Sequence, residues 1–159
     1  MKLFLSTFVH KVDKKGRVSL PSTFRQVLQT GAAEEFAVVR SFQKPALEGM
    51  MMDRMEQLTR VIDGIGVYSQ EQQDLAAVLL ADSKLVTLDS EGRIILSEEL
   101  IVHAGITERA VFVGKGRTFE IWSPETYDGV LQQARQRLSQ SNVSLSLGQL
   151  TSADKVTRE

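Results

Sequence analysis

A sequence motif that occurs twice in the chain constrains the fold more than any other feature. The segment VDKKGRVSLPSTF at residues 12–24 reappears as LDSEGRIILSEEL at residues 88–100, displaced by 76 positions. Each copy continues through a short apolar helical segment into a strand-rich run, 35–42 in the first copy and 109–122 in the second. Two copies are too few for a solenoid. We therefore expect a tandem duplication whose halves pack across a pseudo-twofold axis, because each half is too small to bury its own apolar face.

The composition is that of a folded globular chain. Its 159 residues are 42% hydrophobic and 25% charged, which predicts one domain or two small, closely packed ones. The absence of cysteine excludes disulfides, thiolate metal sites and a cysteine nucleophile, and fits a reducing compartment. The longest apolar run, Leu75 to Ala81, is far too short to span a membrane. Because no cleavage site follows the apolar start, we expect residues 1–11 to form the first strand of a cytoplasmic protein.

Both motif copies contain a turn followed by a strand. Asp13 precedes Gly16 by three residues, and Asp89 precedes Gly92 in the same way. An aspartate can accept hydrogen bonds from the backbone ahead of it, and glycine can adopt a positive φ, so this spacing is typical of a turn. The strands 17–20 and 93–96 follow, and then short helices for which we expect the N-caps Ser22 or Thr23 and Ser97.

Three further helices are expected outside the motifs. The first ends before Gly64, the second begins at the N-cap Ser69, and the third begins at Ser123 with proline at its first position. Beyond Ser139 we expect a loosely ordered tail. The first of these helices carries an apolar stripe that we expect in the core or between protomers: Met51, Met55, Leu58 and Ile62.

Residues able to carry catalysis are scarce. The two histidines, His10 and His103, occupy different places in the two copies and have no ligand-spaced carboxylates beside them, so we interpret both as packing or surface residues. The glycines at 114–117 and 64–66 complete no phosphate-binding motif, and we interpret the two segments as a hairpin turn and a helix stop. We expect no enzymatic activity, cofactor, metal site or small-molecule ligand.

Charge separates the two copies. Residues 10–25 hold five cationic side chains and one carboxylate, a net charge of +4, whereas residues 86–101 hold one cation and four carboxylates, a net charge of −3. The pattern Asp-x-x-Gly-Arg is retained in both copies although the net charge around it changes sign. This indicates a structural role for Asp13, Gly16, Asp89, Gly92 and Arg93. The added cations of the first copy then indicate a binding function, although a run of charges is more commonly only a solvated surface.

The pair DKKGRVSLPSTFR and DSEGRIILSEEL, followed by VFVGKGRTFEIW, resembles the MraZ family of bacterial transcriptional regulators, which carry two SpoVT-AbrB-type motifs. The resemblance covers roughly residues 1–138. It implies an α+β fold, an AbrB-like swapped-hairpin β-α-β (double-split) barrel doubled within the chain, with flanking helices. It also implies a ring-like homo-oligomer in the cytoplasm, associated with the nucleoid. That oligomer would repress the division and cell-wall gene cluster, including its own promoter, by binding direct repeats in double-stranded DNA.

The second copy departs from the family pattern, with Ser97 where a proline is common and no arginine near Leu100. We therefore expect a basic, DNA-contacting motif at 7–54, a helical connector at 55–82, an acidic structural motif at 83–126, and a helix with a tail at 127–159. Lysines would hold phosphates, and Arg17 is the candidate for a guanine edge. The expected DNA-binding residues are Lys11, Lys14, Lys15, Arg17 and Arg25.

Two alternatives belong to other classes. The first is an antitoxin of the same general fold that neutralises a toxin partner and regulates its own synthesis, although such chains usually carry a single motif. The second is an enzyme similar to a pyruvoyl decarboxylase of a related barrel fold, which matures by cleavage between glycine and serine. None of the eleven glycines in this chain precedes a serine.

Overall fold

The computed structural model describes residues 3–29 and 35–146. In chain order, its elements are β1 (Thr7–Lys11), β2 (Arg17–Ser19), α1 (Ser22–Leu28), β3 (Glu35–Arg40), β4 (Leu47–Met51), α2 (Met52–Asp63), α3 (Gln70–Leu75), the π-helix η1 (Ala76–Ala81), β5 (Lys84–Thr87), β6 (Arg93–Ile95), α4 (Glu98–Ala104), β7 (Arg109–Gly114), β8 (Thr118–Trp122) and α5 (Pro124–Ser139).

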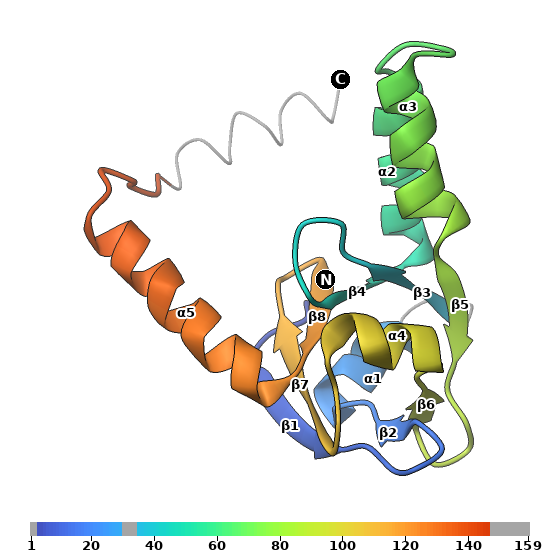
Figure 1. Cartoon of the computed structure of the whole chain (residues 1–159), viewed down its shortest axis with the longest axis vertical. Helices are drawn as coiled ribbons and strands as arrows, with labels where there is room; N and C mark the ends of the chain where they lie inside the picture. Colours follow the sequence, from blue (N-terminus) through green and yellow to red (C-terminus); the bar gives the residue numbers. More distant parts are fainter. Residues whose placement is uncertain (1–2, 30–34, 147–159) are drawn as a thin grey trace. The chain divides into compact units, whose positions relative to one another are not determined.

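An antiparallel six-stranded sheet and a two-stranded ribbon form the frame (Figure 1). The sheet order is β1-β7-β8-β4-β3-β5, and β2 pairs with β6 in the ribbon. Equivalent strands of the two copies occupy mirror places in this order: β1 with β5, β7 with β3, and β8 with β4. The arrangement agrees with the pseudo-twofold packing that the duplicated motif predicts.

The two copies exchange strands. β1 of the first copy pairs with β7 of the second, and β5 of the second pairs with β3 of the first. Because each copy's first strand completes the other copy's half of the sheet, the halves depend on each other for their backbone hydrogen bonds. The predicted α+β class is confirmed. The described strands do not close into a barrel, since β1 and β5 end the sheet.

The main core lies between the sheet, the ribbon and the helices α1 and α4. Phe24 of α1 is fully buried, and its ring lies 5.2 Å from that of Phe4 and 5.3 Å from that of Phe119. The ribbon contributes the buried Val18 and Ile94 to the same cluster. Burial of each such side chain contributes about 1.5–3 kcal/mol, so the core holds the ribbon firmly against the sheet.

A second cluster packs α2 against the sheet. Met55 of α2 is buried with Ala37, Val39 and Met50, while Leu58 lies partly buried beside them. These strand residues alternate with those of the main core, which places the second cluster on the opposite face of the sheet. Of the predicted apolar stripe, Met55 and Ile62 are buried within the protomer, so neither is available as a contact between protomers, whereas Met51 ends β4 and packs against the main core.

The helix starts predicted at Ser69, Ser97 and Ser123 are confirmed, whereas Met51, which was expected on a helix, is the last residue of β4. Ser69 accepts a hydrogen bond from the Gln72 backbone at 3.1 Å, and Ser123 accepts one from Thr126 at 3.3 Å. The prediction of Ser22 or Thr23 as N-cap is wrong. The N-cap is Pro21, whose ring holds φ at −53°, so Ser22 already belongs to the first turn.

The chain divides into two compact units, Met1–Tyr127 and Asp128–Glu159. Of the tail expected beyond Ser139, residues 140–146 carry no helix or strand, and 147–159 lie outside the described residues. In the portion of the chain that is described, no helix is long and apolar enough to cross a membrane.

Candidate nucleic-acid interface

Asp13 organises the turn of the first motif. Its Oδ1 accepts hydrogen bonds from the backbone N–H groups of Lys15 at 2.9 Å and Arg17 at 2.8 Å, and its Oδ2 accepts one from the Arg17 Nε at 2.6 Å. Gly16 completes the turn with a φ of +83°. The carboxylate thereby fixes both the backbone of the loop and the orientation of the Arg17 side chain.

The turn of the second motif repeats this geometry. Asp89 Oδ1 accepts hydrogen bonds from the Glu91 and Arg93 backbones at 2.8 and 2.9 Å, and its Oδ2 accepts one from the Arg93 Nε at 3.0 Å. Gly92 has a φ of +76°. The two loops therefore have the same hydrogen-bonded turn structure.

The arginines of the two copies differ in their remaining partners. Arg93 also forms an ion pair with Glu91, with its Nη2 3.1 Å from Oε2. The residue equivalent to Glu91 in the first copy is Lys15, which is exposed. Within the described residues, the terminal nitrogens of Arg17 have no such ion pair. The Arg17 guanidinium thus pairs with one carboxylate, that of Asp13, whereas the Arg93 guanidinium pairs with two, those of Asp89 and Glu91.

These contacts lower the pKa values of both aspartates. For Asp13 the largest cause is the hydrogen bond from the Arg17 backbone, and for Asp89 it is the equivalent bond from Arg93. The Asp89 hydrogen bond also raises the pKa of Arg93. Each loop therefore contains a carboxylate held in its charged form, which keeps the arginine oriented.

The ribbon presents both motif arginines on one face. Arg17 lies opposite Ile95 and Ser19 lies opposite Arg93 in the β2–β6 register. Between them, Val18 and Ile94 point into the core, so these four residues point the other way. The Leu96 backbone donates to the Gly16 carbonyl at 2.8 Å at one end, and the Leu20 backbone donates to the Gly92 carbonyl at 3.0 Å at the other.

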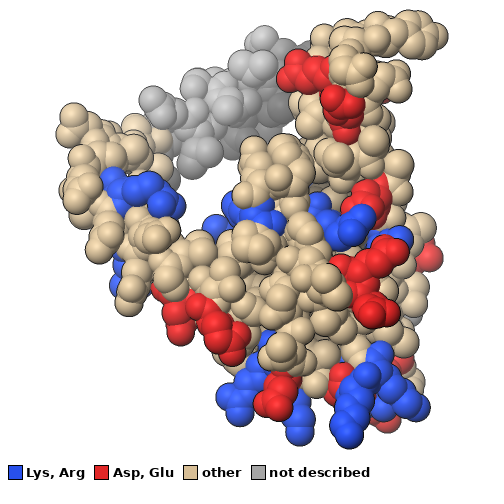
Figure 2. All heavy atoms as spheres, in the orientation of Figure 1, with Lys and Arg blue, Asp and Glu red and all other residues tan. Residues whose placement is uncertain are grey.

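Cationic side chains gather at the end of the ribbon that carries Arg17. Lys14 and Lys15 are exposed on the adjoining loop. Lys11, also exposed, lies opposite Arg109 in the pairing of β1 with β7. Figure 2 shows Lys and Arg side chains, with Asp and Glu side chains between them, along the lower edge of the view, where the loop between β1 and β2 lies in Figure 1. Since like charges on facing strand positions repel each other, an anion at this surface would relieve that repulsion.

Arg109 was not predicted from the sequence. It lies 98 positions from Lys11 in the chain, and only the exchanged pairing of β1 with β7 makes the two neighbours. No local pattern in the sequence carries that information.

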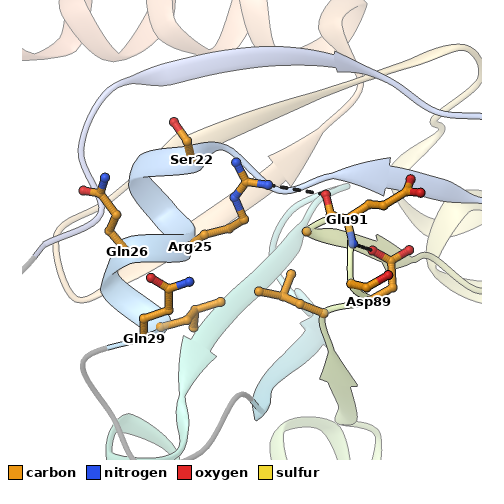
Figure 3. A pocket seen from close by; sticks show the side chains of 10 residues that line it. Ser22, Arg25, Gln26, Gln29, Asp89 and Glu91 are labelled. Atoms are coloured by element: carbon orange, nitrogen blue, oxygen red, sulfur yellow. Dashed lines mark hydrogen bonds between the residues drawn. The ribbon is translucent and has the colours of Figure 1, made fainter.

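Arg25 lies apart from the other predicted DNA-binding residues. Its Nη1 is 3.5 Å from the carbonyl oxygen of Glu91, at the second motif (Figure 3). It borders a hollow of about 600 Å³ between α1 and the second-motif loop, lined also by Ser22, Gln26 and Gln29. The equivalent position in the second copy is Ile101, which packs near Gly16. Arg25 therefore contributes to the contact between the two copies.

The histidines have different surroundings. His10 Nδ1 lies 2.7 Å from the Ser19 carbonyl oxygen and its ring lies 5.7 Å from Phe112, which ties β1 to the ribbon. His103 is half-buried on α4. No group of three or more potential metal-ligating His, Cys, Asp or Glu side chains occurs among residues 3–29 and 35–146.

Known proteins resemble the chain over most of its length. A protein named "Transcriptional regulator MraZ" from Pelagibacter ubique is 37% identical over 143 residues, covering 90% of this chain and 92% of that protein. A protein of the same name from Gluconacetobacter diazotrophicus is 40% identical over 143 residues, covering 88% and 90%. The chain belongs to the MraZ family. The resemblance drawn from the two motifs is thereby confirmed.

The family assignment includes the second motif. The family model described as "MraZ protein, putative antitoxin-like" matches residues 79–146, which contain β5 to β8. A further MraZ protein, from Azorhizobium caulinodans, is 35% identical over 148 residues, covering 93% of this chain and 94% of that protein. The acidic second motif is therefore part of the region that resembles the family.

Proposed function

We propose that the chain is a transcriptional regulator that binds double-stranded DNA through the loop of its first motif and the adjoining end of the β2–β6 ribbon. The observation that carries the proposal is the arrangement of Arg17, which Asp13 holds through Nε while Lys14 and Lys15 lie exposed beside it. The relatives named above as transcriptional regulators support it.

The chemistry of this surface suits the major groove. A two-stranded β-ribbon fits that groove, and an arginine fork donates two hydrogen bonds to the O6 and N7 atoms of guanine. The Asp13 contact uses Nε, which leaves the two terminal nitrogens of Arg17 for such a fork. The lysines, as mobile point charges, suit phosphates, which fix position without specifying sequence.

Binding through this surface requires several protomers. The whole chain has a net charge of −1, and one loop can neutralise only about three or four phosphates, too few for tight binding at cellular salt. A homo-oligomer that repeats the loop along one groove multiplies the neutralised phosphates and raises the effective concentration. We propose a ring-like assembly that binds direct repeats, with the exchanged strands acting as the swapped-hairpin unit of each protomer.

The two motif copies then have separate roles. The first, at 7–54, contacts DNA, and the second, at 83–126, builds the fold and pairs its arginine with a second carboxylate, that of Glu91. The regulated genes would be the division and cell-wall cluster with the chain's own promoter, repressed at the nucleoid.

A salt titration tests the proposal. The probes are a duplex from the region upstream of the gene and a scrambled duplex of equal length. Replacing Lys14 and Lys15 with Gln should weaken binding to both duplexes by similar factors and reduce the slope of log K against log salt by up to about 0.9 for each phosphate that is no longer neutralised. Replacing Arg135 and Arg137, two exposed cations of α5, with Gln makes the same change in charge and serves as the control. An unchanged slope in the lysine variant, or an equal change in the control, would refute this surface as the DNA site.

The antitoxin-like description of the family model supports a second candidate function, neutralisation of a toxin. It predicts that a small toxin co-purifies with the chain and is inactive in the complex. DNA binding by the purified chain alone, with no toxin recovered from its host, would favour the regulator.

A further inference from the structure

One residue of the ribbon face departs from the expected pattern. Ile95 is 63% exposed, although it lies in a strand whose neighbour Ile94 is fully buried. The equivalent residue of the first copy is Ser19, so polar and apolar residues alternate in β2 and do not in β6. Burial in the core explains why position 94 is aliphatic, but nothing in the packing of the ribbon requires an aliphatic side chain at position 95.

The pairing of the ribbon places Ile95 at its basic end. Ile95 lies directly opposite Arg17, and the next residue, Leu96, donates its backbone N–H to the Gly16 carbonyl of the first-motif loop. Although the second copy supplies it, Ile95 is a neighbour of Arg17 and of the loop that carries Lys14 and Lys15. The other end of the ribbon pairs Ser19 with Arg93, beside Glu91.

Spacing allows Arg17 and Ile95 to contact the same or adjacent base pairs. Facing residues of an antiparallel pair have Cβ atoms about 4.5–5.5 Å apart. Successive bases along one strand of DNA are about 3.4 Å apart. The major groove displays one apolar group, the 5-methyl of thymine, among donors and acceptors. An exposed aliphatic side chain beside a guanine-contacting arginine complements that methyl group.

We propose that Ile95 is a specificity-determining residue that packs on the 5-methyl group of a thymine beside the base contacted by Arg17. This rests on the proposed function, because it requires the ribbon to lie in the major groove. Under this proposal, both copies contribute to the end of the ribbon that contacts bases. The first copy supplies the arginine and the other cations, and the second supplies the apolar contact.

The experiment removes the methyl group from the DNA and the side chain from the protein. Selection from a random duplex library with the wild-type chain first provides a binding site. Each thymine of that site is then replaced with deoxyuridine, which lacks only the 5-methyl group. For wild type we expect one substitution to weaken binding about fourfold, the loss equivalent to about 0.8 kcal/mol for one buried methylene-sized group.

The Ile95→Ser variant should bind the thymine and deoxyuridine sites equally, and Ile95→Val should retain most of the preference. Leu85→Ser is the control, because Leu85 is also a strand residue and is 62% exposed. It should keep the full preference of wild type. Light scattering of each variant establishes that the oligomer is unchanged.

Two results would overturn the inference while leaving the proposed function in place. One is a wild-type chain that binds its selected site and tolerates deoxyuridine at every position. The other is an Ile95→Ser variant that prefers thymine over deoxyuridine as strongly as wild type does. If that variant also dissociates into smaller species, Ile95 is a contact between protomers. A wild-type chain that binds neither selected nor random duplex would overturn the proposed function itself.

Discussion

Replacement of Gly16 with alanine should destabilise the protein strongly, because Gly16 is a buried residue of a tight turn. Gly16 has a φ of +83°, and a Cβ built there would lie 2.3 Å from the backbone oxygen of Leu96. That oxygen belongs to the chain segment leaving β6, so relief of the clash requires the ribbon end and the loop to move apart. The Leu96 to Gly16 hydrogen bond of 2.8 Å lies at the same place.

The magnitude has two parts. A left-handed backbone costs an ordinary L-residue about 1–2 kcal/mol. Overpacking against an element that must shift costs about 1–3 kcal/mol more. The free energy of unfolding of Gly16→Ala should therefore fall by about 2–5 kcal/mol, a large part of the 5–15 kcal/mol that is typical of globular domains.

Gly116→Ala is the matched control. Gly116 has nearly the same φ, +87°, and a Cβ there would meet nothing within 4 Å. It should lose only the backbone part, about 1–2 kcal/mol. Equilibrium urea unfolding, followed by circular dichroism at one fixed protein concentration, measures the three proteins side by side. Equal losses in the two variants would refute the close packing of the first-motif loop on the second copy.

Two further predictions concern the charged groups of the second motif and of the turns. Glu91→Lys should strengthen binding to any DNA sequence and steepen the salt dependence of binding, because it removes the Glu91 ion pair of Arg93 and adds a cation. The same change at the exposed Glu71 of α3 should have neither effect. Filter binding at two salt concentrations measures both variants. The lowered pKa values of Asp13 and Asp89 imply a contribution to stability that is present above the unfolded pKa, about 3.9, and is lost as the pH falls through the lowered folded values. Replacing both with Asn should flatten the decline in thermal midpoint below about pH 4, and an unchanged decline would contradict this assignment.

The duplicated motif was sufficient to predict the paired halves, the turns and the short helices. These features depend on local chemistry: an aspartate three residues before a glycine, and apolar residues at helical spacing. The exchange of β1 and β5 between the copies depends on long-range pairing, which no local pattern encodes. That exchange is what brings Arg109 to Lys11.

The candidate site likewise contains residues that were predicted from the sequence and residues that were not. The loop cations were predicted to bind DNA from the charge pattern together with the family resemblance, and Arg25 was grouped with them on the same grounds. In the structure, α1 carries it to Gly92 of the second copy. Ile95 had a signal that could have been used, since it interrupts the alternation that Ser19 maintains in the equivalent strand.

A paired comparison of Arg17→Ala and Arg93→Ala tests most directly whether the first copy alone supplies the essential guanidinium. Each variant removes one Nε hydrogen bond to the aspartate of its own turn, at 2.6 and 3.0 Å. Arg93→Ala also removes the ion pair with Glu91, but an exposed ion pair contributes little to stability, so the two unfolding free energies should fall by similar amounts. Binding to the upstream duplex should be measured by titration at one salt concentration, after light scattering has shown that both variants assemble as wild type does. We expect Arg17→Ala to lose specific binding and Arg93→Ala to retain it. Equal loss by two folded, assembled variants would show that DNA binding needs both guanidinium groups, and would contradict the claim that the first copy alone supplies the essential one.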